Sequence, residues 1–481
     1  MGLPLGTDGK RSQCEDNAGQ GINSHFSWMK RLDGWGLFIF AAGSAFLYGA
    51  NQLRVAGVLM VLSFLMANFI RFPSALAKVF PAPWELLFFS AWVIWAGSTG
   101  FLAADDRALY LRHLTIIVQM MVMVWTAYAI LGNQKSCDVV FLALAVGGGV
   151  QLAAAATGGA FSGGSALTAE RAMGLTSNAN TLGFRMLYML FCAALFWHTP
   201  LPWRRMIRLA ILGLFPAAAY VIAVSGSRKS ALAFALLLFS WVYVIPQVKT
   251  ARFRRVFGTS LALAVLSGLL VTAAPVFLEN TALGNRFAEF LERGRTRSDL
   301  LSEEQTDLMK AAEANSRYAM YTEGLRIFLE HPVFGVGLYN FGRYFSAGWT
   351  HSDYMEPLVT TGFIGFLLYH SFYWCVLLRS LRVMKSVADP QTLYRLKMSV
   401  VGVLLILFLG FGTPHYTSQP TFLLLTALSA YSWRVHREIL QAAQDVRIKR
   451  PIGDTFGRKD GHVDSGSVVR CESSLLTTST S

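Results

Sequence analysis

Four basic side chains and one histidine are the residues of this sequence that could do chemistry at a common site. The cations are Arg171, Arg228, Lys229 and Arg317, and they lie in segments that separate apolar stretches. Guanidinium and ammonium groups bind anionic partners such as phosphates, lipid head groups or acidic glycans. His351 adds an imidazole, the side chain best suited to accept a proton near pH 7.

His351 stands just before a predicted helix whose first turn contains Glu356 and Pro357. The partial positive charge of a helix N-terminus disfavours imidazolium, and nearby arginines act in the same direction. Both effects keep the ring neutral and able to accept a proton, whereas Asp353 opposes them. The residues alone therefore leave two interpretations of His351, a general base or a structural histidine.

Each candidate cation also has a structural interpretation. Arg228 and Lys229 adjoin in the tight turn 225–230 between two apolar spans, where a lone cation often extends along its aliphatic stem to water. Two adjoining cations fit that explanation less well. Arg171 follows Glu170 and could pair with it at the surface.

The segment 314–330 has apolar residues at helical spacing and is followed by Pro332, so we expect an amphipathic helix there. On this helix Arg317 and Arg326 lie either on a wet face or over the outer mouth of the bundle. Arg185, inside a predicted span, could likewise reach a membrane surface.

The composition places all these residues in a membrane protein. Of 481 residues, 54% are hydrophobic and 15% are charged, whereas soluble proteins have about 25% charged residues. An ordinary soluble enzyme and a disordered chain are thereby excluded. The net charge of +14 suits anionic partners, but the basic residues form short clusters between apolar runs, so nucleic acid is not expected.

Hydropathy predicts an all-α polytopic integral membrane protein with about twelve transmembrane helices, because a spanning helix needs about 20 mostly apolar residues. The predicted spans lie near 34–51, 55–70, 84–104, 114–131, 139–157, 181–197, 207–225, 230–246, 256–278, 356–378, 398–412 and 419–433. The span near 398–412 is short and could break at Pro414.

Lys and Arg are more numerous in the short loops on the side of the N-terminus, where Arg379 and Arg395 are counted. The positive-inside rule therefore predicts that both termini are cytoplasmic. The predicted organisation is a cytoplasmic tail (1–33), nine spans (34–278), a large periplasmic loop (279–355), three spans (356–435) and a partly disordered cytoplasmic tail (436–481).

Several kinds of chemistry have no motif here. The glycines of 158–164 and 335–337 are not followed by the Gly-Lys-Ser/Thr of a phosphate-binding loop. Neither HExxH nor GxSxG occurs, and the five cysteines form no CxxC pair. We expect no cofactor and no metal ion.

Three segments and one spacing form a combined signature. The first segment is Arg171-Ala172-Met173-Gly174 with Asn178-Ala179-Asn180-Thr181-Leu182-Gly183. The second is Ser225-Gly226-Ser227-Arg228. The third runs from Arg317 through His331-Pro332-Val333-Phe334-Gly335-Val336-Gly337 to Asn340-Phe341. The spacing is His351-Ser352, nine residues, then Gly362-Phe363-Ile364-Gly365. With these segments the sequence resembles the bacterial O-antigen ligase/polymerase superfamily, most closely an O-antigen ligase; Asp353 and Tyr354 depart from the small or apolar residues more usual there.

The resemblance implies a glycosyltransferase of the integral-membrane (GT-C-like) type in the bacterial inner membrane, acting in lipopolysaccharide biosynthesis. Such an enzyme transfers O-antigen from undecaprenyl pyrophosphate to lipid A–core oligosaccharide on the periplasmic side, without ATP or metal. His351 is then the general base of an inverting displacement, and Arg171, Arg228 and Arg317 bind the donor pyrophosphate. The secondary candidates are Lys229, Asn180, Arg185, Arg326 and Asp353.

Two alternatives stay open. An O-antigen polymerase or a protein O-oligosaccharyltransferase would use the same donor with another acceptor. A lipid or glycan transporter also fits twelve spans, although transporters usually carry internal repeats and polar sites near the membrane midplane.

Overall fold

The structure is a computed structural model that describes most of the predicted spans. The described residues are 29, 31–46, 50–68, 82–134, 137–156, 162–163, 171–172, 175, 179–199, 203–244, 317–345, 349–412 and 415–449. The predicted span 256–278 and the first part of the predicted large loop lie outside them.

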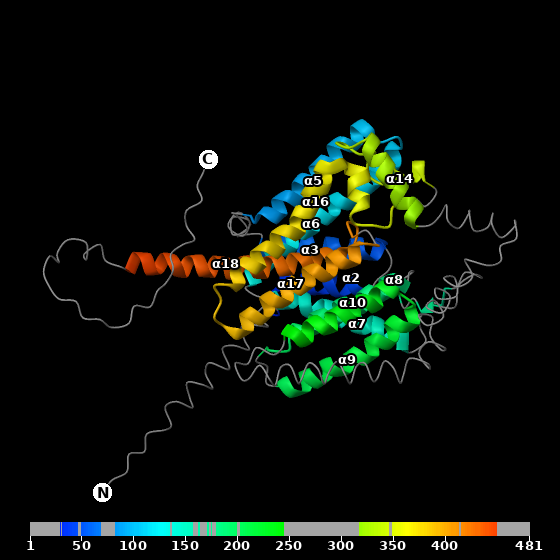
Figure 1. Cartoon of the computed structure of the whole chain (residues 1–481). Coiled ribbons are helices and arrows are strands. Elements are labelled where there is room, and N and C mark those ends of the chain that lie inside the picture. Colours follow the sequence, from blue (N-terminus) through cyan, green and yellow to red (C-terminus); the bar gives the residue numbers. More distant parts are fainter. Residues whose placement is uncertain are drawn as a thin grey trace, which may run out of the picture. The chain divides into compact units, whose positions relative to one another are not determined.

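The described chain is helical apart from one minimal pair of strands (Figure 1). The helices are α2 (Leu32–Phe46), α3 (Ala50–Asn68), α5 (Trp84–Ala103), α6 (Arg107–Gln134), α7 (Asp138–Ala156), α8 (Ala179–Ala194), α9 (Arg204–Ser225), α10 (Arg228–Val244), α14 (Arg317–Glu330), α15 (Phe341–Tyr344), α16 (Met355–Met384), α17 (Pro390–Gly410) and α18 (Gln419–Lys449). The antiparallel strands are β1 (Ser162–Gly163) and β2 (Arg171–Ala172).

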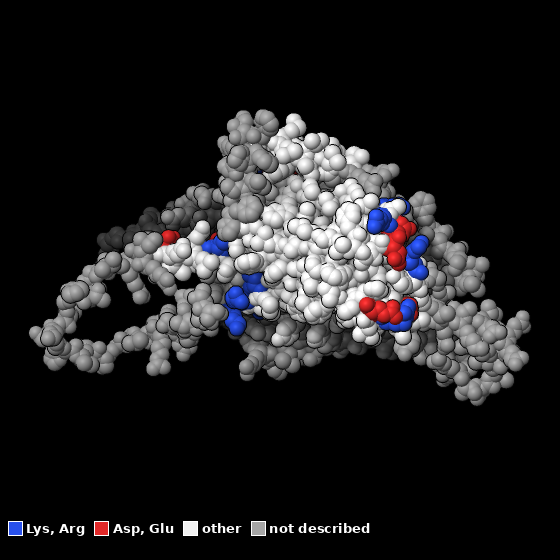
Figure 2. All heavy atoms as spheres, turned by 90° about the horizontal axis from the view of Figure 1, so that it is seen from above, with Lys and Arg blue, Asp and Glu red and all other residues white. Residues whose placement is uncertain are grey.

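This architecture confirms an all-α polytopic membrane protein. Within the described residues, six helices are long and apolar enough to cross a membrane, namely α5, α6, α7, α9, α16 and α17. The other predicted spans that the structure describes are helices as well, but α2, α8 and α10 have only 15, 16 and 17 residues. Figure 2 shows charged side chains gathered at two edges of the visible face, with an uncharged surface between them, as a lipid-facing belt requires.

Four predicted spans extend six residues or more beyond an expected end. Helix α6 begins at Arg107 and not near 114, and α16 continues past 378 to Met384, so Arg379 is a helix residue and not a loop residue. Helix α17 starts at Pro390, where the Asp389 carboxylate caps it by accepting from the Thr392 amide at 2.7 Å, and not near 398. Arg395 is therefore not a loop residue: it is buried inside α17 and pairs with Asp138 of α7 at 2.9 Å. Helix α18 continues past 433 to Lys449. A paired charge near a helix end lowers the hydropathy of a window without ending the helix.

Helix pairs build the bundle, with α16 packed on α5 and α17, α2 on α3 and α7, and α8 on α7 and α9. These contacts lie within one compact unit, Met1–His436, whereas Arg437–Ser481 forms a second unit.

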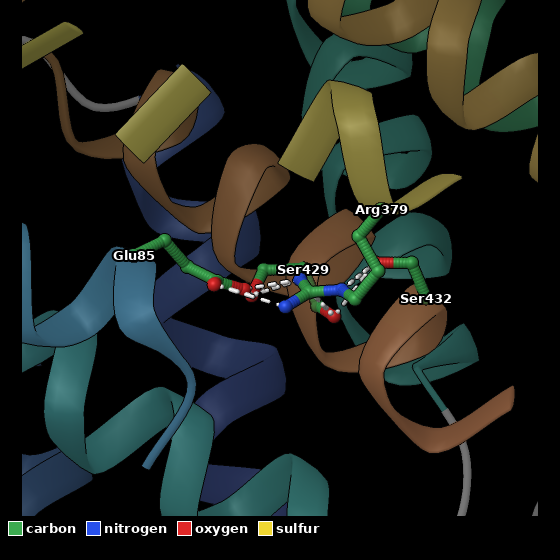
Figure 3. Close-up of polar contacts among 4 residues, drawn as sticks. All are labelled: Glu85, Arg379, Ser429 and Ser432. Atoms are coloured by element: carbon green, nitrogen blue, oxygen red, sulfur yellow. Dashed lines mark hydrogen bonds and ion pairs between the residues drawn. The ribbon is translucent and has the colours of Figure 1, made fainter. Parts of the chain in front are cut away.

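A buried ion pair joins α5, α16 and α18 (Figure 3). The Arg379 guanidinium donates to both carboxylate oxygens of Glu85, to the Ser429 side chain and carbonyl, and to the Ser432 hydroxyl. Ser429 also donates its hydroxyl to Glu85. The Glu85 side chain is 0% exposed, so its charge is stabilised by these partners and not by water.

Candidate functional site

The bundle has a loop end, where α5 and α17 finish and where α16 and α18 begin. Residues 331–345 cover this end by docking on a break in α16. Gly362 has φ 70° and ψ −173°, which interrupts the helix. The interruption leaves the Val359 and Thr360 carbonyls to accept from the amides of Val336 (3.0 Å) and Gly337 (2.9 Å). The third signature segment thus contacts the backbone of the nine residues that separate Ser352 from Gly362.

A side chain at position 362 has no room, since an added Cβ would lie 2.1 Å from the Val333 carbonyl oxygen. Phe363 donates its amide to the Pro332 carbonyl at 2.8 Å beside it. The glycine therefore permits both the positive φ and the close approach of the two backbones. This contact fixes the 331–345 loop on the helix that follows His351.

His351 itself has a left-handed backbone with φ 53°, a state that only a few per cent of non-glycine residues adopt, histidine more often than most. Its neighbours impose that state. Thr350 donates its amide (2.8 Å) and its hydroxyl (2.9 Å) to Glu356, and the Ser352 hydroxyl accepts the amides of Tyr354 and Met355. The imidazole is half-buried. Strain of this kind persists only where surrounding contacts over-determine it, and it concentrates at functional sites.

Asp353 anchors the same turn to the rest of the bundle. Its carboxylate is buried and accepts from the Tyr369 hydroxyl (2.8 Å), the Tyr373 hydroxyl (3.3 Å) and the His415 amide (2.7 Å). Its own amide donates to the Gly410 carbonyl at 2.7 Å. Burial raises the pKa of Asp353 to about 7, an effect larger than the lowering by its hydrogen bonds.

The predicted turn 225–230 is a helix stop followed at once by a helix start. Gly226 ends α9 in the left-handed conformation (φ 62°). Ser227 precedes α10, and its hydroxyl accepts the Ser230 amide at 3.4 Å. Gly183 of α8 packs here, with the nearest atom to an added Cβ being the Ser230 hydroxyl oxygen at 2.3 Å. The first and second signature segments therefore touch.

The connector between α17 and α18 (411–418, with 413–414 not described) joins this turn to the His351 segment. Lys229 donates its ammonium to the Gly412 carbonyl and lies 5.9 Å from the ring centre of Phe184. Phe184 contacts the His415 ring edge-on at 6.2 Å. Since the His415 amide binds Asp353, one chain of contacts runs from the 225–230 turn to the 350–354 turn.

The remaining predicted residues are placed as far as the structure describes them. Arg171 is in β2, which contacts α8 and α9, and Arg317 begins α14; the side chains of both are outside the described part. One turn after Arg317, Tyr321 donates its hydroxyl to the Phe411 carbonyl of the connector at 2.8 Å. Asn180 lies in the first turn of α8, before Gly183.

The exposed side chains of Arg228 and Arg326 differ in their surroundings. Arg228 is the first residue of α10, at the turn that holds Lys229. Arg326 bridges Glu323 and Glu330 on α14, as expected for the solvated face of a helix. The ion pair and hydrogen bonds to Arg326 lower the pKa of Glu323.

Three buried polar atoms at the loop end have no hydrogen-bond partner among the described residues: Arg185 Nη1, His415 Nε2 and Glu356 Oε1. Burial, and to a lesser degree the charge of Lys229, lower the pKa of His415 to about 3, so its ring is neutral. Such atoms cost free energy unless a ligand or water satisfies them. The loop end therefore combines cations, a neutral imidazole and unsatisfied polar groups.

Sequence reasoning missed the connector and the role of Glu356. The signal for the connector was the polar interruption Gly412-Thr413-Pro414-His415-Tyr416 between two apolar spans. Nothing in the sequence marks Glu356 as the residue that holds Thr350. Within the described residues, no group of three or more His, Cys, Asp or Glu side chains could hold a metal ion.

Fold and site together define a class, a polytopic α-helical membrane protein with a polar site at one end of its bundle. Residues 212–370 match the protein family described as O-Antigen ligase. This match covers about a third of the chain, including the 225–230 turn, His351 and the break at Gly362. It confirms the resemblance to the O-antigen ligase/polymerase superfamily and supports an enzyme of the glycosyltransferase kind. No curated protein matches the chain.

Proposed function

We propose that the protein is an O-antigen ligase of the bacterial inner membrane. It transfers O-antigen from undecaprenyl pyrophosphate to lipid A–core oligosaccharide at the periplasmic face, and both its termini are cytoplasmic. The observation that carries the proposal is the meeting of separate signature segments at the loop end, through Gly183, Lys229 and Asp353. The match over 212–370 supports the same conclusion.

In the proposed reaction, the His351 imidazole takes the proton of an acceptor hydroxyl. The resulting oxygen attacks the anomeric carbon of the donor sugar and forms the new glycosidic bond with inversion. The bond from that carbon to the pyrophosphate oxygen breaks, and undecaprenyl pyrophosphate leaves with the bonding electrons. The constrained backbone of His351 supports this role, because a general base must be held in reach of the proton.

Arg171, Arg228 and Arg317 neutralise the charge that grows on the leaving pyrophosphate. Arginine suits this task because its planar group donates two parallel hydrogen bonds to phosphate oxygens and stays charged. Lys229 holds the connector carbonyl, and Asp353 holds the connector amide. We assign these two residues a positioning role and keep Asn180 and Arg185 of α8 as secondary candidates.

Lipopolysaccharide gels of a deletion strain test the acceptor. A ligase predicts bare core after deletion and restored long chains on complementation with the wild-type gene. A polymerase would leave core carrying a single repeat unit, and a protein O-oligosaccharyltransferase would leave the lipopolysaccharide unchanged while glycoproteins disappear. Either of the last two patterns would overturn the ligase assignment while keeping the donor.

A further inference from the structure

Four half-buried rings form a continuous row that ends at His351. His113 of α6 stacks on Tyr339 with a centroid distance of 3.8 Å and an interplanar angle of 10°. Trp349 meets Tyr339 edge-on at 5.9 Å, and His351 meets Trp349 edge-on at 5.3 Å. Each of the four is neither fully buried nor fully exposed. The row therefore lies at the boundary of the protein, beside the proposed base.

The backbone holds this row rigidly at two points. Within the described part of the chain, the non-glycine residues with positive φ are Tyr339 (64°) and His351 (53°), and both belong to the row. The turn that presents Tyr339 is fixed by its neighbour Asn340, whose side chain accepts the Asp106 amide at 2.9 Å and whose amide donates to Gly337 at 3.2 Å. Two strained aromatic positions in one row indicate selection for the position of the rings and not for helix stability.

The row differs from the aromatic core of the bundle. The fully buried rings of Trp92 and Tyr369 pack on each other, and the fully buried ring of Phe372 packs on Phe89, so these rings fill space. The rings of the row keep part of their surface accessible and combine an apolar face with a polar edge. That combination suits a sugar ring, because the polarised C–H bonds of one pyranose face pack on the negative face of an aromatic ring. The hydroxyl groups of the sugar then reach the polar edges or water.

We propose that Trp349, supported by Tyr339 and His113, forms a stacking subsite for a pyranose ring next to the reacting centre. This inference rests on the proposed function, since that function supplies the saccharide and the role of His351. The pyranose belongs either to the acceptor core or to the donor O-antigen, and both offer the same C–H face. The subsite orients the sugar so that its reacting atom faces the imidazole.

Steady-state kinetics with purified lipid-linked O-antigen and lipid A–core test the subsite. Trp349→Ala removes the ring, Trp349→Leu keeps apolar volume without an aromatic face, and Trp349→Phe keeps a face. The matched control is Trp374→Ala on α16, where the side chain is 49% exposed. We expect Ala and Leu to raise KM for one substrate roughly tenfold, which corresponds to about 1.4 kcal/mol, with Phe intermediate. A rise for the core substrate assigns the subsite to the acceptor, and a rise for O-antigen assigns it to the donor.

Unchanged KM values for both substrates in Trp349→Leu, with Trp374→Ala as wild type, would overturn the subsite. Saturation-transfer NMR with delipidated core oligosaccharide and with released O-antigen separates this failure from failure of the proposed function, because it requires no turnover. Binding of either saccharide by wild type and its loss in Trp349→Leu would support the subsite even if no transfer occurred. Equal signals in wild type and Trp349→Leu would contradict it even if transfer were normal.

Discussion

The Arg379 network and the loop end of the bundle differ in how their buried polar side chains are satisfied. At the end where α16 finishes, Arg379 uses all three of its nitrogens on Glu85, Ser429 and Ser432 (Figure 3). At the loop end, Arg185 and His415 each keep a buried nitrogen without a partner among the described residues. A network whose polar atoms all have hydrogen-bond partners needs no further ligand, whereas buried atoms without partners can still bind one.

Backbone conformation follows the same division. The buried ion pair joins regular parts of α5, α16 and α18, so each of its side chains projects from standard helical backbone. The loop end instead has a break in α16 at Gly362 and positive φ at His351. The first region holds helices together, and the second presents groups in a geometry that helices alone would not allow. Variants should therefore separate stability from transfer.

The largest change in stability is expected for Arg379→Ala. Removing the guanidinium leaves the Glu85 carboxylate buried without its counter-charge, which should cost about 3–5 kcal/mol of unfolding free energy. Arg382→Ala, an exposed site on the same helix, is the control and should change stability by less than about 0.5 kcal/mol. Denaturant unfolding in lipid nanodiscs measures both. If the double variant Glu85→Leu/Arg379→Leu recovers most of the lost unfolding free energy, the loss is due to the unpaired charge. If Arg379→Ala is as stable as wild type, the Arg379 network does not stabilise the fold.

Arg228→Ala should lower the transfer rate and leave the stability unchanged. Its side chain is exposed, so stability should hold, but the loss of one charge-stabilising donor should lower the transfer rate by about 10²–10³. Single-turnover transfer with excess enzyme measures the rate of the chemical step. Arg382→Ala serves again as the matched exposed arginine, with wild-type turnover expected. Normal turnover in a folded Arg228→Ala would remove this residue from the pyrophosphate site.

Gly362→Ala should moderately reduce both the stability and the transfer rate. A Cβ at φ 70°, 2.1 Å from the Val333 oxygen, must push the 331–345 loop away, which we expect to cost about 1–3 kcal/mol. Gly213→Ala in α9 is the control, because no atom lies within 4 Å of its added Cβ. There the substitution should stabilise by about 0.5–1 kcal/mol. If both glycine variants were equally stable, the docking contact would not hold the loop.

The smallest effect is a pH dependence from Asp353. Its pKa is about 7 in the fold against an ordinary value of 3.8. The folded state therefore favours the protonated form, so its contribution to stability is complete below the ordinary pKa and is lost as pH rises through 7. Between pH 6 and pH 8 we expect a loss of about 1 kcal/mol, seen as a fall of a few degrees in Tm. Asp353→Asn should flatten this slope, and identical slopes in both proteins would contradict the assignment.

Hydropathy predicted most helices because lipid demands long apolar helices with internally satisfied backbones. The start of α17 was wrong since a window counts Arg395 as polar, while its partner Asp138 lies in another helix. The amphipathic helix that Pro332 follows is confirmed, with α14 ending at Glu330.

The site was predictable only in part. Residue types and order indicated Arg228, Lys229 and His351, but the contacts of the connector depend on three-dimensional packing between distant segments. Gly362 was visible as one element of a spacing, whereas its reason, the approach of the Val333 carbonyl, exists only in the fold. Local sequence patterns report the propensity of a segment for a helix or a turn. They do not report which distant backbone segment will pack against it in the fold.

The most direct test of the central claim compares wild type and His351→Ala in one reconstituted transfer assay. Both proteins are placed in vesicles with lipid-linked O-antigen and lipid A–core, and the ligated product is measured by gel. The proposed mechanism predicts that His351→Ala loses about 10²–10⁴ of the transfer rate, the usual contribution of a general base, while its unfolding transition stays within error of wild type. Full transfer by folded His351→Ala would contradict the assignment of the loop end as the catalytic site.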